Sequence, residues 1–212
     1  MSTHKYIIVD GLVKSGKSRL VEILSQKFDS RLILDNKENP FLDDYYLSVI
    51  DQNNSMPLKT QLIFLLNRYA QQQEINQKEL FHKTTLCDYM FYRDGMYANL
   101  TLTDEELDIY KKIFNIFSEN VAQCDLAIYL QLSFTEMLKR IREQGTEAEK
   151  NTPTEYWREL YEAYNYFFFN YKSSPLLVVN MEKINLDNPD EINRLIGEIN
   201  THKRGTQYYA PA

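Results

Sequence analysis

The sequence predicts an α/β fold in which a five-stranded parallel β-sheet carries helices on both faces, as a three-layer sandwich. Short apolar runs alternate with longer amphipathic stretches along the whole chain, and this alternation is typical of a parallel sheet covered by helices. The run at residues 126–130 is continuously apolar, as expected of a strand that is buried on both faces.

The N-terminal part contributes the first three predicted strands. Residues 6–9 are apolar and β-branched and lead into Asp10-Gly11, so this strand ends in a glycine turn. Apolar residues then recur on one face of residues 17–28, which predicts an amphipathic helix. The same criteria predict strands at residues 32–34 and 84–87 and a long helix at residues 58–80.

The C-terminal part contributes the other two strands. Thr103 and Glu106 form a T-x-x-E capping box, which predicts a helix start at residue 104. Neither a repeat nor a break in composition divides the chain, so we predict one domain over residues 1–201 and a flexible tail at residues 202–212. The remaining predicted elements are helices at 104–121, 135–142 and 154–171 and strands at 126–130 and 176–179.

Composition restricts the partners. The chain has 212 residues, of which 43% are hydrophobic, and this is long enough for a sizeable core. Its formal net charge is −6, whereas nucleic acid polymers and acidic lipids attract proteins through Lys and Arg. We therefore expect neither a nucleic acid polymer nor a membrane as partner, while a small phosphorylated ligand needs only a few local cations.

The two cysteines and the N-terminus indicate an intracellular protein. Cys87 and Cys124 lie in separate apolar stretches and are expected to be reduced core thiols. Their number and spacing do not fit a zinc site. The N-terminal segment does not resemble a signal peptide, and no run approaches the length of a spanning helix. The predicted location is the cytoplasm.

Residues 11–18 read GLVKSGKS, which fits the phosphate-binding pattern G-x-x-x-x-G-K-[ST] between a strand and a helix. Glycines let backbone N–H groups curl around phosphate oxygens, and the helix start adds the positive end of its dipole. The predicted fold is thus a P-loop sandwich that binds an ATP-like nucleotide; a structural glycine turn is the alternative. The candidate nucleotide-binding residues are Gly11, Lys14, Ser15, Gly16, Lys17 and Ser18, with Lys17 on the β- and γ-phosphates and the Ser18 hydroxyl on Mg²⁺.

The segment ENPFLDDYY at residues 38–46 is similar to the ENPFLxxFY signature of bacterial deoxyadenosine/deoxyguanosine kinases. The similarity continues in unbroken order over about residues 4–185, so it is more specific than the P-loop alone. It implies a doubly wound sheet, ATP with Mg²⁺, phosphorylation of a deoxynucleoside 5′-hydroxyl, and a homodimer. The other matching segments are TQLIFLLNRY (60–69), CDYMFYRDGMYANLTL (87–102), DLAIYLQLSFTEMLKRI (125–141), EYWRELYEAYNYFFFNY (155–171) and PLLVVN (175–180).

The resemblance implies an acceptor site. Gln61 offers an amide to the base edge, and Arg68 recognises the base together with Asp94. Tyr46 contacts the sugar 3′-hydroxyl with Glu149 from the lid. The alternatives are a solvated helix face with a local ion pair for the first group and a packing role for Tyr46.

The resemblance also implies catalytic and metal-binding residues. Asp35 is the candidate general base, and Asp88, at the end of the third strand, helps to position Mg²⁺. Arg140 lies on the helix that leads into the lid, at about residues 142–152, and contacts phosphate together with Lys17. A simple strand-end carboxylate and a solvated arginine are the alternatives for Asp88 and Arg140.

The candidate general base, Asp35, departs from the family pattern. The family has Glu where this chain has Asp35, and the match requires a one-residue deletion. The missing methylene moves the carboxylate by about 1 Å, and misplacement on that scale can cost about 10²-fold in rate. Glu38 is a second candidate base, and Tyr89 stands where an arginine often follows the strand-end Asp.

The lid departs as well. The family usually reads R-x-x-R-G-R-x-x-E, but Gln144 and Thr146 stand where two arginines are expected. Those cations normally stabilise charge on the transferring phosphoryl group. Arg142 is one candidate replacement, although it faces a different side of the helix. Lys14, at a P-loop position where Gly is common, is another.

The leading hypothesis is an ATP-dependent deoxynucleoside kinase that acts on purine deoxynucleosides. A deoxynucleoside monophosphate kinase is the first alternative, and it requires a second phosphate pocket, for which Lys37, Lys59 and Arg93 are candidates. The second alternative is a catalytically weakened nucleotide-binding protein of the same fold, which the altered lid and shortened base support.

Overall fold

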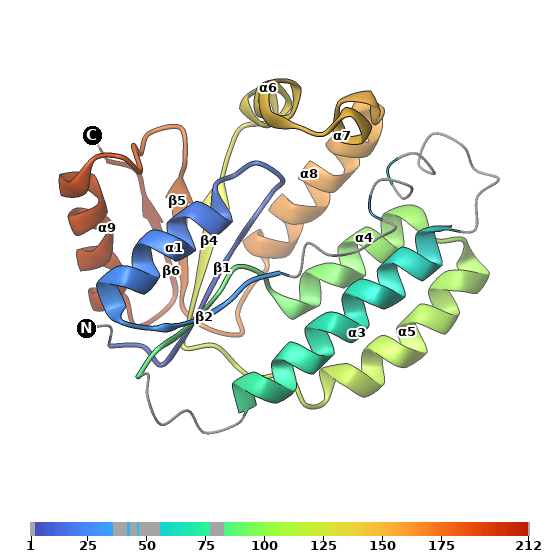
Figure 1. The fold of residues 1–212 in the computed structure, drawn as a ribbon, viewed down its shortest axis with the longest axis horizontal. Helices are drawn as coiled ribbons and strands as arrows, with labels where there is room; N and C mark the ends of the chain where they lie inside the picture. The colour runs from blue at the N-terminus through green and yellow to red at the C-terminus, as the bar shows by residue number, and fades with distance from the viewer. Residues whose placement is uncertain (1–2, 36–41, 43–45, 47–55, 77–82, 212) are drawn as a thin grey trace.

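The protein was analysed as a computed structural model, which describes residues 3–35, 42, 46, 56–76 and 83–211. Strands and helices alternate along the chain as predicted, and the sheet is parallel throughout (Figure 1). Most of the ENPFLDDYY segment, including Glu38, lies outside the described residues, as does Lys37.

The sheet has six strands in the order β2-β3-β1-β4-β5-β6. Because β1 lies between β3 and β4, the chain winds in opposite directions from it, and parallel sheets bind ligands at the carboxyl ends of their strands at such a point. The strands are β1 (Tyr6–Gly11), β2 (Arg31–Ile33), β3 (Thr85–Cys87), β4 (Leu126–Gln131), β5 (Leu176–Asn180) and β6 (Thr206–Tyr209).

The prediction of a flexible tail at residues 202–212 was wrong. Residues 206–209 form β6, which pairs in parallel with β5 in the register Leu176↔Thr206 to Val179↔Tyr209. Strand β5 would otherwise expose a row of unpaired backbone groups at the sheet edge. The tail satisfies these groups, and its Thr and Tyr residues suit a strand.

The helices lie on both sides of the sheet. Figure 1 shows α1 and α9 on one side, and α8 and α4 followed by α3 and α5 on the other. The described helices are α1 (Lys17–Phe28), α3 (Met56–Asn76), α4 (Asp94–Thr101), α5 (Asp104–Ser118), α6 (Phe134–Gln144), α7 (Glu147–Asn151), α8 (Thr154–Phe169) and α9 (Pro189–Thr201), with a 3₁₀ turn η1 (Phe91–Arg93).

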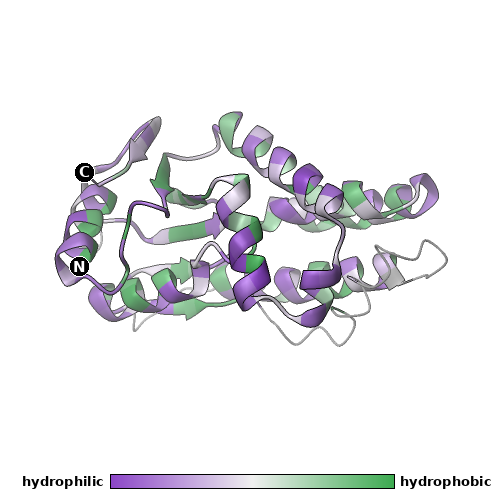
Figure 2. Cartoon of the chain, turned by 90° about the horizontal axis from the view of Figure 1, so that it is seen from above, coloured by the Kyte–Doolittle hydropathy of each residue, from purple (hydrophilic) through white to green (hydrophobic). Residues whose placement is uncertain are grey.

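The main core surrounds the central strands. All six residues of β1 and the first five of β4 are buried, and the strands are correspondingly rich in hydrophobic residues in Figure 2. A smaller apolar cluster, centred on Leu65, Phe91 and Tyr110, joins α3, η1 and α5 beyond the sheet. This second cluster holds α3 firmly enough to present side chains to the carboxyl edge of the sheet.

Several local predictions are confirmed. Thr103 and Glu106 form the capping box at the start of α5, with each side chain accepting from the other residue's backbone N–H. Cys87 and Cys124 are buried free thiols. Among the described residues, no helix is long and apolar enough to span a membrane.

Candidate active site

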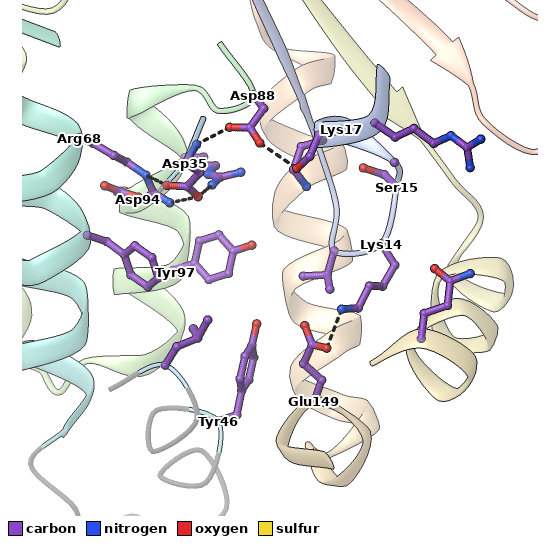
Figure 3. A pocket seen from close by; sticks show the side chains of 18 of the residues that line it. Lys14, Ser15, Lys17, Asp35, Tyr46, Arg68, Asp88, Asp94, Tyr97 and Glu149 are labelled. Carbon is purple, nitrogen blue, oxygen red and sulfur yellow. Dashed lines mark hydrogen bonds and ion pairs between the residues drawn. The ribbon is translucent and has the colours of Figure 1, made fainter. Parts of the chain in front are cut away.

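A pocket of about 440 Å³ lies at the carboxyl edge of the sheet (Figure 3). The P-loop, the ends of β2 and β3, helices α3 and α4, and the α6–α7 region contribute its walls. All the predicted site residues line it except Gly11 and Arg140. The structure therefore brings together residues that lie far apart in the sequence.

The P-loop takes its shape from positions with unusual backbone requirements. A Cβ atom on Gly11 would lie 2.6 Å from the carbonyl oxygen of Leu130, so only glycine fits there. Lys14 and Gly16 both have positive φ, at 58° and 93°. These two left-handed residues curl the chain into the start of α1, where backbone N–H groups form a cradle for phosphate.

Lys17 is folded back onto its own loop. Its Nζ donates to the carbonyl oxygens of Gly11 and Leu12, at 2.7 and 2.9 Å. Burial, followed by the nearby Arg93 guanidinium, lowers the pKa of Lys17 to about 8. An incoming phosphate supplies the counter-charge that this position needs, so it would both attract the lysine and favour its protonated form.

Asp88 connects the P-loop to the end of β2. Its Oδ2 accepts from the Ser18 hydroxyl at 2.9 Å, and its Oδ1 accepts from the Asp35 backbone N–H at 2.5 Å. The oxygen donors Ser18 and Asp88 fit Mg²⁺, which typically takes one or two carboxylates and completes its shell with water and substrate phosphates. Within the described residues no group of three or more His, Cys, Asp or Glu could hold a metal ion.

Asp35 lies at the centre of a network of buried charges. Arg68 donates to both of its carboxylate oxygens, from Nε at 3.0 Å and from NH2 at 2.7 Å. Arg93 forms a second ion pair with Oδ2. Burial alone would raise the pKa of Asp35, but the two arginines outweigh it and lower the pKa to about 2. Asp35 is therefore a fixed carboxylate at neutral pH.

Arg93 is a site residue whose role the sequence analysis missed. It is only 5% exposed, and its NH1 pairs with Asp10 Oδ1 at 3.1 Å while its NH2 pairs with Asp35. Asp10 also accepts from the backbone N–H groups of Met90 and Gly11. The available signal was its place one residue before Asp94, because the η1 turn carries both into the pocket.

Tyr89 lies beside Arg93, at a position where the family pattern has arginine or, in many bacterial members, tyrosine. Tyr89 is fully buried, and the guanidinium carbons of Arg68 and Arg93 lie 5.3 and 6.0 Å from the centre of its ring. Tyr89 thus packs beside both arginines, and Arg93, four residues further along the chain, pairs with Asp35.

Helix α3 presents Gln61 and Arg68 to the pocket from one face, as their seven-residue spacing predicts. They are only 2% and 4% exposed, which rules out the solvated helix face. Arg68 pairs with the fully buried Asp94 and lies 4.9 Å from the ring centre of Phe64. A buried amide beside a buried ion pair is suited to hydrogen bonding with the edge of a base.

Tyr46 and Glu149 face the lower part of the pocket from opposite sides (Figure 3). Tyr46 lines the pocket and also packs against Trp157, with ring centres 5.7 Å apart, so the packing alternative holds alongside its place in the site. Glu149 Oε2 accepts from the Thr146 backbone N–H at 2.7 Å and pairs with Lys14 Nζ at 2.8 Å.

Arg140 is placed differently from the prediction. It pairs with Glu136 at 2.8 Å, and its other nitrogens donate to the carbonyl oxygens of Met181 and Lys14 at 3.2 and 3.4 Å. It therefore braces the P-loop from outside the pocket lining. Its neighbour Arg142 is exposed and does not line the pocket either.

These features define a class, the P-loop nucleotide-binding proteins in which an acceptor pocket opens beside the phosphate cradle. The chain belongs to the deoxynucleoside kinase family, whose family model matches residues 7–203. It is accordingly a phosphoryl-transferring enzyme, as the strand order and P-loop suggest.

Relatives of known function agree with this assignment. The chain is 30% identical to a deoxyguanosine kinase of Bacillus subtilis over 77% of this chain and 78% of that protein. It is 26% identical to a deoxyadenosine kinase of Lactobacillus acidophilus over 84% of this chain and 86% of that protein. The fold matches the dATP-bound deoxyadenosine kinase of M. mycoides with a TM-score of 0.75 and 23% identity, over 92% of this chain and 100% of that chain.

Proposed function

We propose that this protein transfers the γ-phosphoryl group of ATP to the 5′-hydroxyl of a purine deoxynucleoside, in nucleotide salvage. The observation that carries the proposal is a single pocket in which the P-loop lies beside the Asp35 carboxylate and the buried Gln61, Arg68 and Asp94. The purine preference rests on the relatives, which are named as deoxyguanosine and deoxyadenosine kinases.

Phosphoryl transfer here depends on positioning and charge. The P-loop N–H groups and Lys17 hold the phosphates of ATP. Asp35 accepts a hydrogen bond from the 5′-hydroxyl and orients its oxygen toward the γ-phosphorus. A new O5′–P bond forms as the bond from the γ-phosphorus to the bridging oxygen breaks, ADP leaves, and the hydroxyl proton is released past Asp35 to solvent. The pKa of Asp35, lowered to about 2, suits an orienting carboxylate better than a strong base.

Magnesium would be held by Ser18 and Asp88 with the phosphate oxygens, since these are the oxygen donors at the end of β3. When bound, the ion neutralises charge on the β- and γ-phosphates. The Ser18–Asp88 contact keeps both oxygens in place beside the P-loop.

Residues of α3 would recognise the base of the acceptor, and residues near the lid would bind its sugar. The Gln61 amide can donate and accept on the base edge, while Arg68 and Asp94 supply a donor and an acceptor of fixed geometry. Tyr46 and Glu149, on opposite sides of the lower pocket, would hold the 3′-hydroxyl.

A homodimer in the cytoplasm is also proposed. The outer faces of α4 and α8 flank a shallow hollow whose lining includes Tyr166, and Tyr166 and Phe169 are 75% and 82% exposed. Large apolar side chains gathered on one face are typical of an interface. Sedimentation velocity would test it, since Tyr166→Glu with Phe169→Glu should yield monomers.

The monophosphate kinase alternative is not favoured. Arg93, one candidate for a second phosphate pocket, is engaged by Asp10 and Asp35, and Lys37 lies outside the described residues. Competition by dAMP but not by deoxyadenosine would reverse this preference.

A coupled ADP-release assay tests the proposed function. MgATP is offered with deoxyadenosine, deoxyguanosine, deoxycytidine, thymidine and their monophosphates. We expect turnover on purine deoxynucleosides that disappears in Lys17→Ala. Tight ATP binding without turnover on any acceptor would instead select the weakened nucleotide-binding protein.

A further inference from the structure

We propose that Lys14 is a phosphate-contacting cation that takes over the work of the two missing lid arginines, and that Glu149 holds it in the pocket until nucleotide binds. The inference rests on the proposed kinase function and adds a residue-level assignment to it. Four observations support it: the backbone at Lys14, the partner of its side chain, the chemistry of the lid, and the engagement of Arg140.

The backbone of Lys14 is unusual for a lysine. Its φ of 58° lies in the left-handed region, which is strained for a residue with a Cβ because the Cβ crowds the backbone carbonyl. Glycine would adopt the same conformation without this strain. A lysine in a strained position inside a ligand-binding loop indicates that its side chain has a use there.

The Lys14 side chain points into the pocket. Figure 3 shows its ammonium directed at Glu149 across the space in front of the P-loop, and the Nζ–Oε2 distance is 2.8 Å. The two side chains are 24% and 10% exposed. Glu149 already caps α7 through the Thr146 N–H, so the α7 start does not require Lys14.

The lid supplies no cation of its own to the pocket. Among the described residues of α6 and α7, those that line the pocket are Gln144 and Glu149, an amide and a carboxylate. Arg142 is exposed outside the lining. Arg140 is bound to Glu136 and two backbone carbonyls. Lys14 is therefore placed to provide positive charge to the pocket in addition to Lys17.

A change of the Lys14 partner from Glu149 to phosphate would couple the binding of ATP to the binding of the deoxynucleoside. A polyphosphate brings several negative charges to the P-loop and competes with a single carboxylate for Lys14, whose flexible four-carbon stem allows its ammonium to move. Once Lys14 turns to phosphate, its charge no longer neutralises Glu149, whose Oε2 still accepts from the Thr146 N–H, so the carboxylate becomes a stronger acceptor for a sugar hydroxyl beside Tyr46. Nucleotide binding would thus prepare the acceptor site, and by linkage the deoxynucleoside would strengthen ATP binding by the same factor.

The test compares Lys14→Gly and Lys14→Arg, with Arg142→Ala as the matched control for a cation outside the pocket. Lys14→Gly removes backbone strain, so we expect an unchanged or higher Tm. Its kcat should fall about 10²-fold, the scale for losing one preorganised contact to transition-state charge. Lys14→Arg should retain kcat within about tenfold, and Arg142→Ala should match the wild type.

Binding measurements separate this inference from the proposed function. If Lys14 contacts the terminal phosphate, Lys14→Gly should weaken ATP about tenfold and leave ADP nearly unchanged, as for loss of one charge-assisted contact. This comparison needs no turnover, so it remains decisive even if the protein transfers phosphate to no acceptor. Equal ATP/ADP affinity ratios in wild type and Lys14→Gly, or an equal loss in Arg142→Ala, would overturn the assignment.

Discussion

The two ends of the pocket hold their charges in different ways. At the acceptor end, Asp35 is paired with two arginines, Arg68 and Arg93, which are only 4% and 5% exposed. At the phosphate end, Lys14 has one carboxylate partner and Lys17 donates to two carbonyl oxygens of its own loop. Buried ions with several partners fix a geometry, whereas lysines with replaceable partners can turn toward a ligand.

The comparison also shows how the chain accommodates its departures from the family pattern. The acceptor end lacks the arginine that often follows the strand-end Asp, and Arg93 supplies a guanidinium from the next turn. The phosphate end lacks two lid arginines, and Lys14 supplies an ammonium from the P-loop. In both cases the charge reaches the pocket from a different backbone position.

The largest effect is expected at Arg93. Arg93→Met keeps the volume but leaves Asp10 and Asp35 without their shared partner, and breaking a buried ion pair costs about 3–5 kcal/mol of unfolding free energy. Urea unfolding measures this loss of unfolding free energy. The control is Arg19→Met, because Arg19 pairs with Asp187 at a site where both side chains are more than half exposed, and such pairs contribute at most about 1 kcal/mol. Equal losses of unfolding free energy in Arg93→Met and Arg19→Met would show that the ion pairs of the acceptor end are held no more firmly than an exposed pair.

The next effect concerns Asp35. Asp35→Asn keeps a hydrogen-bond acceptor beside Arg68 but removes the carboxylate from the 5′-hydroxyl, so kcat should fall about 10²–10⁴-fold. Steady-state kinetics with saturating ATP and deoxynucleoside measure this. The Kd of ADP should stay close to the wild-type value, because Asp35 belongs to the acceptor end; a parallel loss of ADP affinity would contradict that assignment.

A smaller effect is expected from pH at the phosphate end. The pKa of Lys17 is lowered to about 8 in the empty protein, below its ordinary value, so the lysine loses its proton as the pH rises through 8. Phosphate prefers the protonated form, and the Kd of ATP should therefore rise by up to about tenfold per pH unit above 8. Calorimetry in buffers of different ionisation enthalpy should detect proton uptake on ATP binding above pH 8, and none in Lys17→Met.

The same shift has a defined effect on stability. A lysine whose folded pKa lies below its unfolded value binds fewer protons when folded, so its unfavourable contribution is complete below pH 8 and decreases between pH 8 and about 10.5. Lys17→Met should therefore raise the Tm more at pH 7 than at pH 10. An equal rise at both values would indicate that Lys17 is not desolvated.

The smallest effect is expected at Glu149. Glu149→Gln keeps the capping geometry, since Gln also serves at that position of a capping box, but it removes the charge that holds Lys14. Lys14, whose side chain is 24% exposed, can turn toward solvent and leave no buried unpaired charge, so the unfolding free energy should fall by less than in Arg93→Met. A loss of unfolding free energy as large as that of Arg93→Met would mean that the charges of the phosphate end are fixed as firmly as those of the acceptor end.

Sequence reasoning was most successful where residues act locally. The P-loop is specified by Gly11, Gly16 and Lys17 within one turn of chain, and the α5 capping box lies within four residues. The apolar run of β4 predicted a central strand because its surroundings are apolar on both faces. The placement of Gln61 and Arg68 on one face followed from helical periodicity.

Reasoning from sequence failed where a residue depends on a distant neighbour. Residues 206–209 have strand-favouring Thr and Tyr but form too short a run to be recognised alone, and they form β6 because the edge of β5 offers backbone partners. The one local signal for Arg93, its place beside Asp94, did not indicate its partners, because Asp10 and Asp35 lie 83 and 58 residues away.

The sequence by itself determined the strand–helix alternation and the phosphate cradle, because these follow from hydrophobic periodicity and from local backbone geometry, and its resemblance to the deoxynucleoside kinases indicated the residues near the acceptor. Only the tertiary structure decided which charges pair: Asp35 with Arg68 and Arg93, and Lys14 with Glu149. Ion pairing depends on distances of a few ångströms between side chains and on the burial that strengthens it. Both are fixed only when the parallel strands bring their carboxyl ends to one edge.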